Sequence, residues 1–455
     1  MNQFISIFLV IILFIISVLV YIFYHKRSFY PYNVCSDYNI DMNTEPILIQ
    51  LKDNHLILPK NYDNTFTVIM KVKVTSTLLG NFFSPHTVIN NTTFKQYYEK
   101  GTNGIRYINL SNTINDESIV KFKNHYCRIS NQTVEIYTYK NEEIKNEKIL
   151  IISPHPDDAE LSAYGLYSEN SSNVLIVTIT AGENGVNLYN IYPSEDSKKN
   201  ELKGKIRTWN SLTVPMLGGL KSNQVLNLGY FDYTLKTMHD NPNSLISSST
   251  IDNVSTSIFR EQNYKNTIIS NNLNNNWNGF LDDIQSVIEY QQPTIIITPH
   301  PQIDGHVDHK YATIALMEVI RKIDYRKGSI FFYTNHFPDA HYFPYGFSKS
   351  ILSLPPIFNN PICFQKLFSF YLDEHKQNEK ILAMDAMNDL RINHDYLSGQ
   401  ILTYNGLKKI KQKMFDIEKD YFNKFVRSNE FFYAISTEML FDEEVYKLLL
   451  QSQND

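Results

Sequence analysis

The chain has few cysteines, no dense cluster of basic residues and no evident internal repeat, and each absence excludes a class of protein. Its three cysteines, Cys35, Cys127 and Cys363, are widely scattered and odd in number. They fit neither a disulfide framework nor a cysteine-based metal site. The formal net charge is -5, so nucleic acid is not expected as a partner. A length of 455 residues leads us to expect two or three domains.

One long hydrophobic run stands at the N-terminus. Phe4 to Tyr24 is unbroken in apolar residues and tyrosine apart from Ser6 and Ser17, and it has about the length needed to cross a bilayer core of ~30 Å. The three residues before it lack the basic side chain of a secretory signal peptide. We therefore predict a transmembrane helix over residues 4–24.

The basic residues after this run set its predicted orientation. Lys26 and Arg27 lie on its C-terminal side, so the positive-inside rule places the bulk of the chain on the cytosolic face. The predicted localisation is a membrane, crossed once near the N-terminus. Sequons at Asn109 and Asn131 would favour the opposite face, but a chain rich in Asn and Ser forms such triplets by chance.

Short segments of alternating polarity follow a polar linker that ends near Thr44. The clearest is Thr65 to Val74, which alternates as a half-buried antiparallel strand does. Similar segments recur at turn-separated intervals and predict a small β-sandwich domain over residues 45–145. No candidate catalytic residue lies in it. We favour a packing or spacer role over sugar binding, which would rest on fold analogy alone.

From Lys148 the pattern changes to alternating strands and helices, which is the mark of a parallel sheet. Strands are predicted at 174–180, 224–228, 294–298, 329–334 and 430–435, and helices at 197–214, 280–290, 364–390 and 407–426. These features predict an α/β fold, with a Rossmann-like, mostly parallel sheet in a catalytic domain over residues 146–440. The Asn- and Ser-rich stretch 241–278 is interpreted as an inserted loop at the mouth of the site.

The first candidate for chemistry lies where the strand beginning at Lys148 stops. Its apolar run ends in a group that contains His155, Asp157 and Asp158. The C-terminal end of a strand in an open α/β sheet is where ligands and catalytic groups collect. An aspartate here would also serve as a helix cap, because a helix is predicted from Ala159. This motif alone does not decide between the two roles.

A second strand ends in a similar group far along the chain. The apolar run 294–298 leads to Asp304, His306, Asp308 and His309. His306 and His309 are three residues apart at the start of a predicted helix, which places both imidazoles on one face. Two such strand ends, side by side over one sheet, would supply the nitrogen and oxygen ligands that suit zinc.

The residues at this point resemble a known family. The two motifs, the turn Ala181–Gly185, Arg207, and Leu228–Gly229 with Asp232 together are similar to the zinc-dependent N-acetylglucosaminyl deacetylases of the PIG-L/LmbE type. The resemblance covers about residues 148–321, and the two His/Asp motifs in this order are its most specific part.

The resemblance implies a role for each of eight residues. They are the zinc ligands His155, Asp158 and His309, the general base Asp157, the oxyanion donor His306, Asp308 beside a histidine, and the sugar contacts Arg207 and Asp232. Amide hydrolysis needs an activated water, a base for its proton and positive charge at the developing oxyanion. Three protein ligands leave Zn2+ an open position for that chemistry.

The expected function is therefore that of a membrane-anchored zinc hydrolase. It would remove the N-acetyl group from an N-acetylglucosamine-type sugar, whether lipid-linked, polymeric or a small glycoside. One alternative is a zinc amidase acting on a non-sugar amide such as an N-acylated thiol conjugate. Another is an inactive glycan-binding membrane protein, against which the complete set of ligands, base and oxyanion donor argues.

Overall fold

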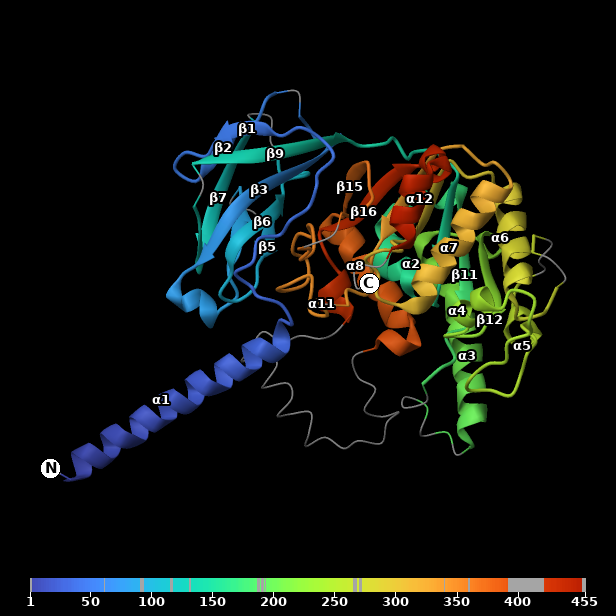
Figure 1. Cartoon of the computed structure of the whole chain (residues 1–455), viewed down its shortest axis with the longest axis horizontal. Helices are drawn as coiled ribbons and strands as arrows, with labels where there is room; N and C mark the ends of the chain where they lie inside the picture. The colour runs from blue at the N-terminus through green and yellow to red at the C-terminus, as the bar shows by residue number, and fades with distance from the viewer. Residues whose placement is uncertain are drawn as a thin grey trace.

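The computed structural model describes residues 2–391 and 421–451 with short gaps. The gaps are 61, 91–93, 115–117, 131, 186–188, 190–191, 193, 265–267, 270–271, 339 and 359–360, and in the first helix side chains are described only at 6–20 and 29. The described chain forms an N-terminal helix, a two-sheet β region and an α/β region built on a seven-stranded sheet (Figure 1).

Helix α1 (Asn2–Phe29) extends away from the rest of the molecule (Figure 1). Across the described residues, no helix meets the length and apolarity of a membrane-spanning segment. The predicted transmembrane helix over residues 4–24 is therefore wrong, and with it the membrane localisation and the single-pass topology.

The β region consists of two antiparallel sheets. The larger contains β1 (Ile47–Gln50), β9 (Thr133–Lys140), β3 (Phe66–Ser76), β6 (Asn103–Asn109) and β8 (Cys127–Ile129). The smaller contains β2 (His55–Ile57), β7 (Ile119–His125), β4 (His86–Ile89) and β5 (Lys95–Tyr97). Every second residue of β3 from Val68 to Val74 is buried in a core shared with β2 and β7, as the period of a strand requires.

The seven-stranded sheet is mixed, which confirms the predicted α/β class. Its order is β12-β11-β10-β13-β14-β16-β15. The parallel strands are β10 (Ile149–Ser153), β11 (Val174–Thr180), β12 (Val225–Tyr230), β13 (Ile295–Pro299) and β14 (Ser329–Tyr333). Strands β16 (Asn429–Ser436) and β15 (Lys366–Tyr371) pair antiparallel to them at one edge. In chain order the parallel strands run 3-2-1-4-5, the order of a doubly wound sheet.

Helices cover both faces of this sheet (Figure 1). On one face Leu150 and Ile296 pack against α6 (Trp277–Gln291), α7 (Val307–Lys322) and α12 (Glu443–Leu450). On the other, Ile151 and Ile297 pack against α2 (Asp158–Glu169) and α8 (Glu374–Ala386). The remaining helices are α3 (Asp196–Thr213), α4 (Leu235–Asp240), α5 (Ser257–Arg260) and α11 (Tyr421–Phe425). Because both faces are covered, these strands are continuous apolar runs.

One predicted helix begins as a strand. The stretch predicted as a helix over 364–390 starts with β15 and becomes helical only at Glu374. Aromatic residues and alternation within Lys366–Tyr371 fit a strand better than a helix, and pairing with β16 over six residues fixes the outcome. Most of the helix predicted over 407–426 lies outside the described residues.

The β region packs directly on the α/β sheet. Asn109 Nδ2 donates to Leu352 O and to Ser369 Oγ, both at 2.9 Å, and Ser369 N donates to Thr67 Oγ1 at 2.9 Å. Tyr107 belongs to the same buried apolar cluster as strands β10 and β13. We keep 45–145 and 146–440 as the proposed domain boundaries, and this contact means that the two regions share buried surface.

Candidate functional site

The site lies at the carboxyl ends of β10 and β13, neighbouring strands at which the strand order reverses. The connections from two such strands leave in opposite directions and open a crevice between them. Helix α2 starts directly after the first motif and α7 directly after the second. Both predicted motifs therefore meet at one place, although about 150 residues separate them in the chain.

The atoms of the three predicted metal ligands converge. His155 Nδ1 lies 3.1 Å from His309 Nε2, and Asp158 Oδ2 lies 3.1 Å from His309 Nε2 and 3.4 Å from His155 Nδ1. Donor atoms bound to a tetrahedral zinc at about 2.0–2.1 Å lie roughly 3.3–3.4 Å apart. The three atoms already have the spacing of ligands around one metal ion, and all three side chains are buried.

A carboxylate oxygen lies near the second ring nitrogen of each of the two predicted ligand histidines. His155 Nε2 lies 3.1 Å from Asp232 Oδ1 and 3.4 Å from Asp308 Oδ2. His309 Nδ1 lies 3.1 Å from Asp304 Oδ2. Carboxylates in this position fix the orientation and the basicity of metal-binding histidines. Asp232 thus lies against His155, and its predicted contact with a sugar stays a prediction.

The buried carboxylates give the cluster an excess of negative charge. Burial alone would lower the pKa of His155, but hydrogen bonds with Asp158 and Asp232 outweigh it and raise that pKa well above its usual value. Burial likewise opposes the charge on His309, while Asp158 and Asp304 raise its pKa to about 9. Protons on the two imidazoles thus balance the carboxylates, and a divalent cation would balance them equally well.

Asp157 stands apart from these donors. Its Oδ2 accepts a hydrogen bond from the Arg207 guanidinium at 2.8 Å, which also donates to Pro156 O at 2.7 Å and to Gly182 O at 3.1 Å. Burial raises the pKa of Asp157 to about 7, with Arg207 opposing the shift. Asp157 has φ of 119°, which is strained for a non-glycine residue. Gly182 has φ of 62°, a conformation that favours glycine, and a Cβ there would lie 2.7 Å from the guanidinium.

His306 caps helix α7 with its ring. Its Nδ1 accepts a hydrogen bond from Asp308 N at 3.2 Å, and its ring centroid is 4.5 Å from that of His155. Burial lowers the pKa of His306 to about 3. The imidazole is therefore neutral, and because Nδ1 accepts, the single ring hydrogen sits on Nε2. His306 can donate one hydrogen bond from Nε2 without carrying a charge.

The end of β14 adds two residues that the sequence motifs did not reveal. Asn335 Nδ2 donates to Asp158 Oδ1 at 2.8 Å, and Asn335 N donates to Asp304 Oδ2 at 2.8 Å. His336 N donates to the same Asp304 oxygen at 3.3 Å. A ligand atom of His336 lies within 4.8 Å of ligand atoms of Asp158 and His309. Their position directly after a predicted strand was the one signal that could have found them.

A charged group borders Asp157. Asp389 accepts from Lys203 Nζ at 3.2 Å and lies 3.4 Å from Arg207 Nη1. The Tyr189 hydroxyl donates to its other oxygen at 3.2 Å. Asp389 lies outside both motifs, and no sequence pattern distinguishes it. The group provides several donors and acceptors next to the proposed base, which is the chemistry that a polar substrate would need.

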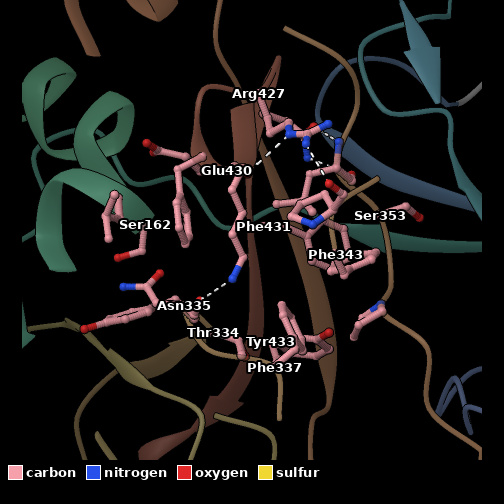
Figure 2. A pocket seen from close by; sticks show the side chains of 18 of the residues that line it. Ser162, Thr334, Asn335, Phe337, Phe343, Ser353, Arg427, Glu430, Phe431 and Tyr433 are labelled. Atoms are coloured by element: carbon pink, nitrogen blue, oxygen red, sulfur yellow. Dashed lines mark hydrogen bonds between the residues drawn. The ribbon is translucent and has the colours of Figure 1, made fainter. Parts of the chain in front are cut away.

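A small cavity is lined by residues that include Ser162 and Asn335 (Figure 2). Ser162 and Asn335, which both bond Asp158, line it together with Phe343, Arg427 and Glu430. Its volume is about 40 Å³, which holds a few water molecules but no sugar. None of the three predicted ligands lines it. The cavity adjoins Asp158 through Ser162 and Asn335 and is not the substrate pocket.

The fold and the cluster together define an α/β protein with a buried His/Asp metal-type site at the switch point of its sheet. Residues 150–320 match the PIG-L family, described as GlcNAc-PI de-N-acetylase. This matched segment contains both His/Asp motifs, and its family is the one that the motifs resemble. The match ends before β14, so the β region and the end of the sheet lie outside it.

Several solved structures resemble the chain at low identity. A crystal structure of a pseudoaglycone deacetylase is 18% identical, with 64% of this chain and 99% of that chain covered and a TM-score of 0.34. The N,N'-diacetylchitobiose deacetylase from Pyrococcus horikoshii is 16% identical, with 65% and 86% covered and a TM-score of 0.34. The 4-carboxy-2-hydroxymuconate hydratase from Pseudomonas putida is 12% identical, with 63% and 96% covered and a TM-score of 0.33. No curated protein matches the chain.

Proposed function

We propose that the protein is a zinc-dependent deacetylase that removes the N-acetyl group from an N-acetylglucosamine-type sugar. The observation that carries the proposal is the convergence of His155 Nδ1, Asp158 Oδ2 and His309 Nε2 within 3.1 to 3.4 Å of one another. The description of the matched family as a GlcNAc-PI de-N-acetylase supports the reaction and the substrate class.

The donor set fits zinc. Two imidazole nitrogens and one carboxylate oxygen are ligands that zinc accepts, and three protein ligands are typical of a catalytic rather than a closed structural site. When bound by His155, Asp158 and His309, zinc would polarise the amide carbonyl and lower the pKa of a water molecule. Asp304 and Asp308 orient the two ligand histidines.

Asp157 is the proposed general base. Its Oδ2 is held by Arg207, which leaves Oδ1 to accept a proton from the attacking water and to return it to the leaving amine. A pKa of about 7 suits a group that takes and gives a proton near neutral pH. Arg207 therefore positions the base, and we assign the recognition of sugar hydroxyls to its remaining N–H group together with Asp389 and Lys203.

His306 is the proposed oxyanion donor. Its Nε2 hydrogen, left free by the capping bond at Nδ1, would face the oxygen on which negative charge develops. A preorganised donor of this kind needs no positive charge of its own to stabilise the transition state. The same hydrogen bond that starts α7 thus fixes the tautomer that the reaction needs.

The first test is removal and return of the metal. The chelated protein should lose hydrolysis of N-acetyl sugars and regain it with one zinc per chain. Zinc must displace the protons on His155 and His309, whose pKa values are both raised, so zinc affinity should rise with pH between 6 and 9. Chelator competition between pH 6 and 9 measures the zinc affinity, and a substrate panel measures the hydrolysis. Hydrolysis of N-acylated thiol conjugates alone would indicate the non-sugar amidase, and absence of zinc and of any hydrolysis would refute the proposal.

The second test is His306→Ala. Zinc content should remain unchanged, and the rate should fall by roughly 10²–10³-fold, the loss measured when one oxyanion donor is removed. His375→Ala is the matched control, since His375 lies on α8 with its side chain 80% exposed. Loss of zinc from His306→Ala would show that His306 is a ligand instead.

A further inference from the structure

We infer that His336 is a further metal-binding residue, which supplies a third imidazole beside His155 and His309. This inference rests on the proposed zinc site. Asp158, His309 and His336 each offer a ligand atom within 4.8 Å of the others. This set shares Asp158 and His309 with the proposed ligands, so it lies at the same metal position and not at a separate one. His306 also lies within that distance of His155 and His309, but its ring caps α7 through Nδ1 and stays assigned to the oxyanion.

The structure holds His336 at this position through its backbone. His336 N donates to Asp304 Oδ2 at 3.3 Å, the same oxygen that lies 3.1 Å from His309 Nδ1. The ring centroids of His336 and His309 are 5.0 Å apart. On one side Asn335 is bonded to Asp158, and on the other Phe337 packs in an apolar cluster with Phe343. The backbone of His336 is therefore fixed, and only rotation of its side chain is needed to bring a ring nitrogen to the metal position.

That rotation must bring the His336 nitrogen closer to the other two donors. The three ligand atoms lie within 4.8 Å of one another, whereas donors around a tetrahedral zinc lie roughly 3.3–3.4 Å apart. A zinc site can hold a fourth protein donor and still bind a water molecule or substrate by becoming five-coordinate.

The contrast with His300 separates this role from packing. His300 is fully buried after β13, with one ring nitrogen 3.2 Å from Cys363 O and the other accepting from Gln302 N at 3.3 Å. Both of its nitrogens contact the loop. The ring of His336 instead lies among the metal-type donors, with its centroid 5.5 Å from that of His306. Its surroundings are those of a ligand.

X-ray absorption of the zinc-loaded full-length protein tests the inference. The unmodified protein should show three imidazole ligands and His336→Ala two, and the zinc dissociation constant should rise at least about 10-fold, because removal of even an outer partner costs ~10–100-fold. Two imidazoles in both proteins would overturn the inference and leave the proposed function intact. A protein that binds no zinc would refute the proposed function itself.

A second variant tests the inference without counting imidazole ligands. His336→Cys loaded with cobalt(II) should show a thiolate-to-metal charge-transfer band that the unmodified protein lacks, because the new sulfur would lie at the metal. His375→Cys, on the exposed face of α8, should show none. Absence of the band from a folded His336→Cys protein that retains one cobalt per chain would also overturn the inference.

Discussion

Asp157→Asn should keep one zinc per chain and lose about 10²–10⁴-fold in rate, whereas Asp158→Ala should lose both zinc and activity. A factor of about 10²–10⁴ in rate is what a positioned acid-base group contributes. The difference follows from what each carboxylate touches. Asp158 Oδ2 lies 3.1 Å from His309 Nε2, and Asn335 fixes its other oxygen. Asp157 is bound to Arg207 and makes no contact with the donor atoms.

A purely structural role for Asp157 is disfavoured by its surroundings. It occupies the N-cap position of α2, yet its side chain makes no capping hydrogen bond, so its replacement should not unwind the helix. Asp196→Asn serves as control, because Asp196 begins α3 with its side chain 73% exposed. Loss of zinc from Asp157→Asn together with its retention in Asp158→Ala would reverse the two roles. Full activity in both variants would refute the proposed site.

The parts of this site that the sequence predicts are the motifs whose residues lie close together along the chain. Each apolar run that ends in His and Asp becomes a buried strand followed by a helix, because burial on both faces and the capping of the next helix are local requirements. Two such motifs, His155–Asp158 and His306–His309, follow neighbouring strands. From the sequence alone their adjacency is a hypothesis, since strand order is not a local property.

The remaining parts depend on contacts between distant segments. Asn335 and His336 enter the site only because β14 pairs with β13, and Asp389 does so because the end of α8 packs near α3. A lone Asn, His or Asp carries no periodic signal. For the same reason, the interpretation of 241–278 as a loop did not predict a buried ion pair. Arg260, within this stretch, bonds Asp283 on α6 at 2.7 Å.

Glu430→Ala should lower the free energy of unfolding by about 3–5 kcal/mol, the loss expected when one partner of a buried ion pair is removed. Glu430 Oε1 accepts from Lys380 Nζ at 2.9 Å, and both side chains are almost fully buried. Its two oxygens also accept from Gly165 N at 2.9 Å and Leu166 N at 3.0 Å. Helix α2 is interrupted at Ala163, so these N–H groups begin its second half and the carboxylate caps them.

This cap links the antiparallel part of the sheet to the site. Strand β16 carries Glu430, and α2, which starts at Asp158, is held against it through the same carboxylate. Urea unfolding of Glu430→Ala measures the loss, with Glu374→Ala as control, because Glu374 is 80% exposed in its pair with Lys349 and such pairs contribute at most ~1 kcal/mol. A loss below that value for Glu430→Ala would mean that Lys380 and the freed N–H groups find other partners. In that case α2 would not depend on β16 for its position.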